Sequence, residues 1–252
     1  MKTKLLLISL LFCGVISHAQ TKIEKTIPVK AGQKLILNFD YPELILQTWD
    51  KNEVLIKGTV SINRGENDAA FDLQVNTDKE ITVTSMITDK ENIPQRIVIK
   101  KGDTEYFFKA KDFNDPEIQK FLEENGREYT YMSNGIIKEI KLEVFVPKNM
   151  ETSVLAKYGM VEVKGFNAPL SIDAKYGGVD ATISTSSTGF LTARSRYGEI
   201  LTNLDIKFDQ TKLPDKSTRS QDKWTEISAQ LGSGPPYLIE SKYGKVYLRK
   251  PN

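Results

Sequence analysis

Hydrophobic and polar residues alternate along most of this chain, in short segments separated by polar turns. An alternation with a period of two residues is typical of β-strands, whose successive side chains point to opposite faces of a sheet. In the N-terminal part of the chain this pattern predicts strands at residues 34–39, 44–49, 53–62, 71–76 and 81–86. We therefore expect an all-β protein.

The segment 154–247 repeats one pattern four times: an apolar residue, any residue, a small residue, a basic residue, Tyr, Gly, any residue and then Val or Ile. The pattern is centred on four basic-tyrosine pairs: Lys157 and Tyr158, Lys175 and Tyr176, Arg196 and Tyr197, and Lys242 and Tyr243. A weaker fifth copy precedes them and includes Tyr41. Repeats of about 20 residues are typical of solenoids, in which each repeat buries its apolar side against its neighbours.

This repeat predicts a right-handed parallel β-solenoid (β-helix), with a β-sandwich of the same short strands as the alternative. The right hand follows from the general preference of parallel crossovers and not from the residues themselves. Equivalent positions on successive turns would lie about 4.8 Å apart. The tyrosines would then stack in one column and the basic residues in the next. The glycine after each tyrosine suits a corner, because glycine readily adopts positive φ.

One segment, residues 87–146, departs from the repeat and is expected to form an irregular insertion. It contains the one predicted helix, residues 115–126, with Asp115 as N-cap, Pro116 at the first helical position and Gly126 as the stop. Two strands are expected at 96–100 and 104–109. Asn134-Gly135 is a favoured turn dipeptide and predicts a hairpin between residues 129–131 and 136–146. The polar stretch 210–223 is expected to be a second insertion, a loop, within a single domain at 20–252.

The first 19 residues have the features of a secretory signal peptide: a basic start, an apolar run and small residues before the expected cleavage between Ala19 and Gln20. We therefore expect export to the periplasm or the extracellular space, with no transmembrane segment. Lipid attachment through Cys13 is disfavoured, because Phe12 stands where a lipoprotein signal needs a small residue.

Removal of this leader limits the chemistry of the remaining chain. Cys13 and His18 are the only cysteine and histidine, so disulfides, a Ser-His-Asp triad and His or Cys metal sites are excluded, and we expect no metal and no cofactor. Loss of Lys2 and Lys4 reduces the 35 Lys and Arg residues to 33, which equals the 33 Asp and Glu residues. A net charge near zero gives no argument for nucleic-acid binding.

Short motifs resemble those of a known family. The opening segment 27–54, the Tyr-Gly repeats and the closing segment 239–250 resemble the bacterial putative-adhesin β-strand-repeat domain, a family of unknown function, and the leader is similar to those of Bacteroidetes members. The resemblance covers most of residues 27–250 except roughly 93–135. It implies a repeated β-strand fold and an adhesin-like role. The family is named from its repeats alone and supplies no catalytic residues.

Three classes of function remain open from the sequence. The first is a non-enzymatic binding or scaffold module of the cell envelope, whose partner is a cell-surface polysaccharide or an envelope protein. Its candidate binding residues are the four basic-tyrosine pairs, because basic groups attract acidic ones and aromatic faces can stack on sugar rings. Alternatively, the tyrosines only pack between repeats, while the basic residues are solvated or paired with Glu162, Asp173 or Asp180.

The second class is a polysaccharide-active lyase or glycosidase, which needs two carboxylates at a suitable separation in a cleft. No Asp or Glu stands in a context that singles it out, so we expect no catalytic residues and no enzyme activity. The third class is an envelope sensor or assembly protein that uses its loops and helix as contacts. The oligomeric state does not follow from the sequence.

Overall fold

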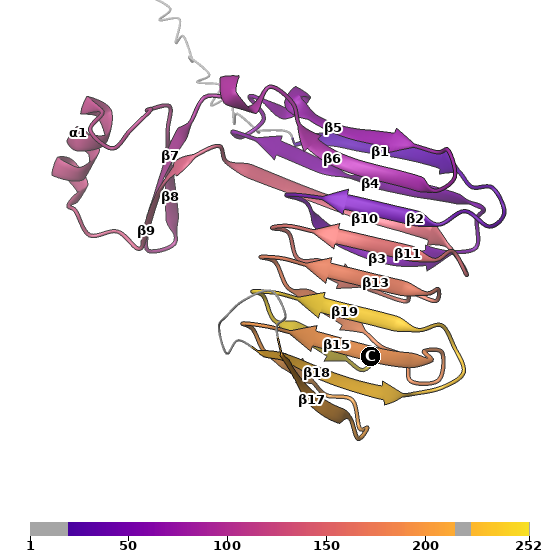
Figure 1. Cartoon of the computed structure of the whole chain (residues 1–252). Helices are drawn as coiled ribbons and strands as arrows, with labels where there is room; N and C mark the ends of the chain where they lie inside the picture. The colour runs from indigo at the N-terminus through magenta and orange to yellow at the C-terminus, as the bar shows by residue number, and fades with distance from the viewer. Residues whose placement is uncertain (1–19, 215–222, 252) are drawn as a thin grey trace, which may run out of the picture.

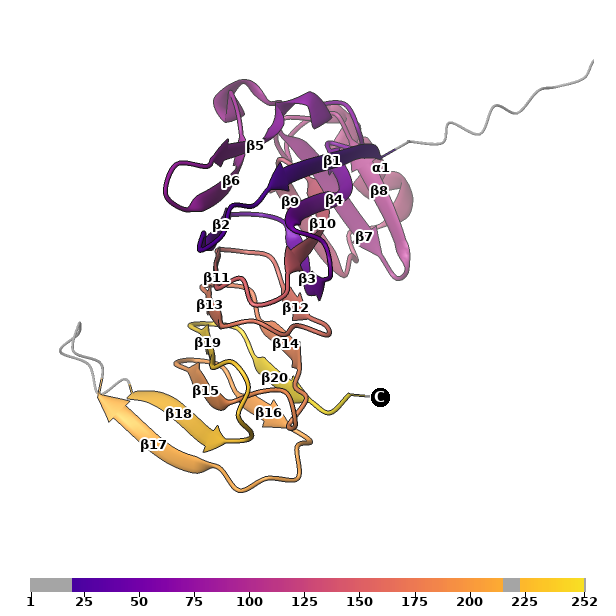
Figure 2. The same ribbon diagram turned by 90° about the vertical axis from the view of Figure 1, so that its right-hand side faces the viewer.

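Two β-sheets face each other across a continuous hydrophobic core in the computed structural model, which describes residues 20–214 and 223–251. Figure 2 shows β2, β11, β13, β19 and β15 in one wall and β3, β12, β14, β20 and β16 in the other. The predicted signal peptide and the centre of the predicted loop, 215–222, lie outside the described residues.

The first sheet has eight strands. In spatial order they are β1 (Thr21–Pro28), β4 (Glu53–Ile62), β10 (Lys138–Pro147), β3 (Glu43–Trp49), β12 (Val161–Val163), β14 (Val179–Thr182), β20 (Val246–Arg249) and β16 (Ile200–Thr202). Strands β10 to β16 are parallel neighbours, whereas β1 and β4, and β4 and β10, pair antiparallel.

The second sheet has nine strands. In spatial order they are β17 (Asp209–Pro214), β18 (Lys223–Gln230), β15 (Phe190–Ser195), β19 (Tyr237–Ser241), β13 (Leu170–Ala174), β11 (Thr152–Ala156), β2 (Leu35–Phe39), β6 (Ile81–Ile87) and β5 (Phe71–Asn76). Strands β15 to β6 are parallel neighbours, and in this sheet antiparallel pairs lie at both ends.

The alternating pattern of the sequence places every second side chain in the core. In β13, for example, Leu170, Ile172 and Ala174 are buried while the residues between them are not. The expected all-β class is confirmed, with one α-helix among the described residues. The sheets are mixed, with antiparallel pairs framing the parallel strands, so the arrangement shares features of a solenoid and of a β-sandwich.

A third, smaller sheet projects from one side of the paired sheets together with the helix (Figure 1). It consists of β8 (Thr104–Phe108), β7 (Arg96–Lys101) and β9 (Tyr131–Gly135). The helix α1 (Pro116–Asn125) packs Ile118 and Leu122 against this sheet in a separate hydrophobic cluster. Asp115 caps the helix as predicted, since its side chain accepts a hydrogen bond from the backbone N–H of Glu117. Two short 3-10 helices, η1 (Asp68–Ala70) and η2 (Lys90–Asn92), complete the described elements.

The predicted hairpin around Asn134-Gly135 is wrong. Asn134 lies within β9, which pairs with β7, and the chain then continues into β10 of the eight-stranded sheet. The insertion therefore ends before Lys138 and not at residue 146. The turn propensity of Asn-Gly is overridden here by the strand pairing that β7 offers to residues 131–135. The prediction of a loop at 210–223 is wrong at both ends: residues 210–214 belong to β17, and Lys223 begins β18.

Candidate functional site

The tyrosines of the repeat form one column along an edge of the paired sheets. Their rings are stacked nearly parallel, with centroid distances of 5.2 Å from Tyr158 to Tyr176, 5.1 Å from Tyr176 to Tyr243 and 5.0 Å from Tyr243 to Tyr197. Tyr41, from the weak fifth copy, stacks on Tyr158 at 5.4 Å. We call these five residues the tyrosine column. The predicted stacking of the repeat tyrosines is confirmed, and Tyr41 from the least regular copy extends the column by one ring.

The order of the tyrosine column differs from the order of the chain. The last copy, with Tyr243, lies between those of Tyr176 and Tyr197, because β19 pairs with β13 on one side and with β15 on the other. The residues that precede it, 223–230, form β18, which pairs antiparallel with the other side of β15. The long gap before the fourth copy thus lets the chain pass the end of the column and return into its interior.

Glycine follows each tyrosine of the four regular copies for a reason other than the predicted one. None of these glycines has positive φ. Instead, the next turn lies so close that a Cβ atom on Gly177 would be 2.0 Å from the carbonyl oxygen of Gly159, and one on Gly198 would be 2.0 Å from that of Gly244. Close backbone approach between turns, and not a left-handed conformation, therefore requires glycine here.

Backbone hydrogen bonds fix the spacing of these turns. The N–H of Tyr176 donates to the carbonyl of Lys157 at 2.8 Å, and the N–H of Tyr243 donates to the carbonyl of Lys175 at 3.0 Å. The rings inherit this spacing from the backbone. Each internal ring is covered on both faces by its neighbours, yet the side chains of the four repeat tyrosines remain 45–48% exposed. The exposed part is thus the ring edge, and sugar rings cannot stack on the internal faces.

Each basic residue of the repeat lies beside the ring of the tyrosine that follows it. The charged groups are 4.8–5.4 Å from the ring centroids, the range of a cation–π contact; the pairs are Lys157 with Tyr158, Lys175 with Tyr176, Arg196 with Tyr197, and Lys242 with Tyr243. We call these four cations the basic row. The row and the tyrosine column are therefore one structure and not two separate columns.

Two of the three counter-charges considered from the sequence are engaged elsewhere. Asp180 pairs with Arg249 at 2.6 Å, and Glu162 pairs with Lys164 at 2.8 Å. Lys157 has a more distant partner in Asp40, at 3.6 Å. Within the part of the chain that the structure describes, Lys175 and Lys242 form no ion pair.

At the Tyr41 end of the column two further lysines approach the ring. The Lys90 ammonium donates a hydrogen bond of 2.9 Å to the Tyr41 hydroxyl, which raises the pKa of Lys90 above its usual value. Lys138 lies 4.9 Å from the ring centroid and donates to the carbonyl of Ile136 at 2.8 Å. Burial lowers the pKa of Lys138. Positive charge therefore continues beyond the four predicted positions.

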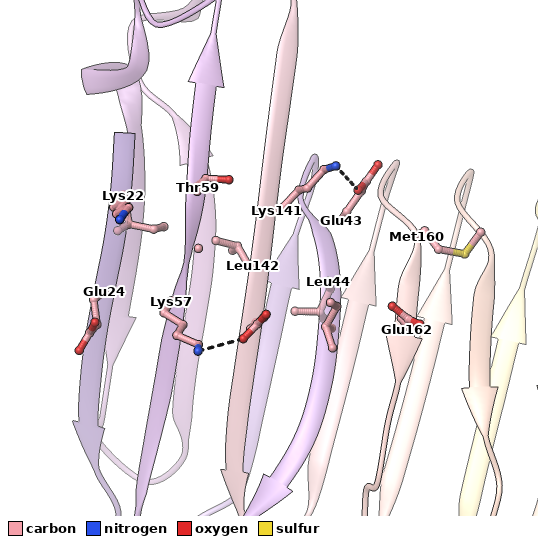
Figure 3. A pocket seen from close by; sticks show the side chains of 14 residues that line it. Lys22, Glu24, Glu43, Leu44, Lys57, Thr59, Lys141, Leu142, Met160 and Glu162 are labelled. Atoms are coloured by element: carbon pink, nitrogen blue, oxygen red, sulfur yellow. Dashed lines mark ion pairs between the residues drawn. The ribbon is translucent and has the colours of Figure 1, made fainter. Parts of the chain in front are cut away.

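A groove of about 560 Å³ on the outer face of the eight-stranded sheet is the second candidate site. Figure 3 shows that charged side chains from neighbouring strands flank its apolar floor. Two ion pairs cross between strands: Lys57 with Glu143 at 3.1 Å and Lys141 with Glu43 at 3.7 Å. Lys57 and Lys141 are thus paired with carboxylates of the same face, in contrast to Lys175 and Lys242.

Sequence reasoning missed this groove, although one residue marks it. Gly58 lies inside β4, and a Cβ atom there would be 1.9 Å from the carbonyl oxygen of Lys141 on β10. An isolated glycine within a predicted strand signals a close backbone approach or a bulge. The flanking lysine and glutamate residues could not have been paired from sequence, because the partners Lys57 and Glu143 are on strands that meet only in the fold.

Over residues 20–214 and 223–251, no group of three or more His, Cys, Asp or Glu side chains is arranged to hold a metal ion. No helix in these same ranges has the length and hydrophobicity required to span a membrane. Of the predicted cleavage site, Gln20 is described and precedes β1 directly, while Ala19 lies outside the described residues.

Comparisons with known proteins include distant similarities to solved structures. No protein-family model and no curated protein matches the chain. A solved structure described as "a putative cell adhesion protein" from Clostridium sporogenes aligns with a TM-score of 0.42 and 11% identity, over 92% of this chain and 100% of the other. One described as "a putative adhesin" from Bacteroides fragilis aligns with a TM-score of 0.23 and 12% identity, over 93% and 99%. At these scores neither similarity carries an argument about function.

Proposed function

We propose that this protein is a non-enzymatic, extracytoplasmic binding module whose basic row binds a linear acidic polysaccharide of the cell envelope. Its body is a right-handed parallel β-solenoid framed at both ends by antiparallel strands. The basic row and the exposed edges of the tyrosine column form the binding face. The predicted signal peptide supports export, and the regular spacing of the turns suits a polymer whose charges recur along its length.

One observation carries this proposal: Lys175 and Lys242 directly follow the adjacent strands β13 and β19, and they have no carboxylate partner among the described residues. Equivalent residues on adjacent strands are about 4.8 Å apart. Two exposed like charges at about 5 Å repel each other by roughly 0.8 kcal/mol in water. A carboxylate or sulfate group placed between the two ammonium groups would remove this repulsion and gain two attractive contacts.

The tyrosines contribute to this face mainly by holding the cations in place. Each stacked ring offers its π-system to the preceding basic residue, an interaction worth about 0.5 to 1 kcal/mol at an exposed site. The rings are themselves fixed by the stack on either side. Long lysine side chains, which otherwise lose rotamer freedom on binding, are therefore partly ordered before a ligand arrives.

The outer groove supports the non-enzymatic part of the proposal. A glycosidase needs two carboxyl groups, one of which must be protonated to act as the acid. Three of the glutamates that line the groove, Glu43, Glu143 and Glu162, form ion pairs with lysines. The carboxylates of these three residues are therefore already engaged by lysines of the protein itself.

Binding to an array of acidic and neutral polysaccharides tests the proposal. The probe protein is residues 20–252, compared with the double variant Lys175→Gln, Lys242→Gln. A matched control, Lys57→Gln with Lys141→Gln, removes the same charge from the outer groove. We expect the wild-type protein and the control to bind acidic polysaccharides and the first variant to bind at least about tenfold more weakly, since each lost contact contributes about 1 kcal/mol. Equal binding by both variants, or no binding to any acidic polysaccharide, would contradict the proposal.

A further inference from the structure

A pocket of about 810 Å³ lies where the chain leaves the paired sheets for the insertion and returns from it. Its lining comes from η2 and the segment after it, from the start of β7, from the residues that follow β8, and from Ile136 between β9 and β10. This joint pocket exists only because the insertion folds back against the body. Nothing in the repeat itself would create it.

Basic residues predominate in the joint pocket. Lys90, Arg96, Lys109 and Lys111 line it, whereas Glu91 is the one acidic residue in its lining. Glu66 stands beside the pocket and contacts two of these cations, Arg96 at 2.6 Å and Lys109 at 2.7 Å. With both glutamates counted, the four cations still exceed the carboxylates by two. The pocket therefore attracts anions.

Arg96 shows that the basic charge is built into the pocket. Only 8% of this residue is exposed, and its guanidinium donates to Glu66 and to the backbone carbonyl of Gln95. Its Nε–H is buried without a hydrogen-bond partner among the described residues. A buried donor without a hydrogen-bond partner destabilises the folded protein. A ligand oxygen that reached the guanidinium would offset part of this destabilisation.

Two asparagines hold the walls of the joint pocket. The buried Asn63 side chain donates to the carbonyl of Pro94 at 2.9 Å and accepts from the N–H of Ile137 at 3.1 Å, so it ties together the departing and returning segments. Asn134 donates to the carbonyl of Lys111 at 2.8 Å. The positions of Pro94 and Lys111 are thereby fixed before a ligand binds.

The joint pocket lies at the Tyr41 end of the tyrosine column. Lys90 lines the pocket and also donates to the Tyr41 hydroxyl. Ile136 lines the pocket, and its carbonyl accepts from Lys138, which lies over the Tyr41 ring. Positive side chains thus continue from the basic row through Lys138 and Lys90 into the pocket.

We infer that the joint pocket is an end subsite that binds the carboxylate of a terminal acidic sugar, while the basic row binds the rest of the polymer. This inference rests on the proposed function, because it assumes that the ligand runs along the basic row. It gives the insertion a role: the insertion supplies Lys109 and Lys111, which the repeat alone could not place there. It also predicts that a single acidic sugar binds, since one sugar can enter the pocket without spanning the row.

Calorimetric titration with glucuronate tests this inference, with neutral glucose as the reference sugar. The variant is Lys109→Gln with Lys111→Gln; both side chains are exposed, and circular dichroism verifies that the variant is folded. The control is the double variant Lys175→Gln, Lys242→Gln. We expect glucuronate to bind the wild-type protein and the control equally, and to bind the pocket variant at least tenfold more weakly. Glucose should not bind.

The outcomes separate this inference from the proposed function. If glucuronate does not bind the wild-type protein, or binds the pocket variant unchanged, the end subsite is refuted even where acidic polymers still bind the basic row. If acidic polymers fail to bind but glucuronate binds and requires Lys109 and Lys111, the proposed function fails. The anion site of the joint pocket would then stand alone.

Discussion

The basic row and the outer groove both present lysines from neighbouring strands, but the two surfaces satisfy these charges differently. In the groove, Lys57 and Lys141 pair with glutamates on the same face. In the basic row, Lys175 and Lys242 contact tyrosine rings and have no carboxylate partner in the described part of the chain. Cation–π contacts order these side chains without neutralising them.

The ion pairs of the groove stabilise the fold, whereas we propose that Lys175 and Lys242, which form no ion pair among the described residues, serve in binding. Exposed ion pairs add at most about 1 kcal/mol of stability, and their charges are no longer available to an outside partner. Charges that remain unneutralised on adjacent strands cost stability and become useful only when an anion binds. The basic row is thus the surface that we propose binds a ligand, and its geometry depends on the close turns beneath it.

The largest expected effect comes from disturbing those turns. In Gly177→Ala the new Cβ would overlap the carbonyl oxygen of Gly159, so the neighbouring turns must move apart. We expect the free energy of unfolding to fall by about 3 kcal/mol, at the upper end of overpacking effects. Urea denaturation measures it. Gly135→Ala is the control, because no atom lies within 4 Å of its added Cβ, and a loss as small in Gly177→Ala as in this control would contradict the role given to the turn glycines.

A smaller effect should follow from removing one ring of the tyrosine column. Tyr176 stacks on both Tyr158 and Tyr243, and each such contact is worth about 0.5 to 1.5 kcal/mol beyond area burial. We expect Tyr176→Ala to lower the free energy of unfolding by about 2 kcal/mol. Tyr176→Phe, which keeps the stacked ring, should change it by less than about 0.5 kcal/mol. Thermal or urea unfolding of the two variants decides whether the ring or the hydroxyl matters.

Single lysine substitutions compare the two surfaces directly. Lys57→Gln removes an ion pair with Glu143 and a contact with the Phe145 ring, so we expect a loss of about 0.5 to 1 kcal/mol. Lys175→Gln loses a cation–π contact but relieves repulsion, and its stability should stay within about 0.5 kcal/mol of the wild-type value. Urea unfolding of the two variants measures both effects. A larger loss of stability in Lys175→Gln than in Lys57→Gln would contradict the difference between the two surfaces.

An effect of similar size that depends on pH is expected at the joint pocket. Hydrogen bonds from Arg96 and then Lys109 hold the pKa of Glu66 below its ordinary 4.5. A carboxyl group with a depressed folded-state pKa adds stability above the unfolded-state pKa, and this contribution is lost as the pH falls through the folded-state value. Glu66→Gln should therefore be less stable than the wild-type protein at pH 7, by less than about 1 kcal/mol for a partly exposed pair.

Urea unfolding at a series of pH values from neutral to well below 4.5 measures the difference between Glu66→Gln and the wild-type protein. The difference should shrink at the acid end. A difference that stays constant over this range would mean that the charge of Glu66 does not contribute.

Much of the local structure follows from the sequence. The strands at 53–62 and 71–76 were predicted with their observed bounds, since each is a clear alternating segment between polar turns. Asp115, Pro116 and Gly126 define a helix by local chemistry alone. The stacking of equivalent tyrosines follows from the repeat, because identical positions on neighbouring turns must lie one above another.

The remaining features depend on contacts between segments far apart in the chain. The Tyr243 copy lies between those of Tyr176 and Tyr197 because β19 pairs with both β13 and β15. The repeat in the sequence does not determine this order. Likewise, Glu66 and Arg96 meet only because the insertion folds against the body. The positive φ expected of the turn glycines was wrong, since local sequence does not reveal how closely the next turn approaches.

The salt dependence of binding is the most direct test of the claim that unneutralised cations in the basic row bind the ligand. Polygalacturonate is titrated into the wild-type protein, into Lys175→Gln with Lys242→Gln, and into Lys57→Gln with Lys141→Gln, at increasing salt. Screening shortens the Debye length from about 10 Å at 0.1 M to about 3 Å at 1 M salt. The account predicts that affinity falls steeply with salt for the wild-type protein and the groove variant but only weakly for the variant of the basic row. Equal salt dependence in all three proteins would contradict it.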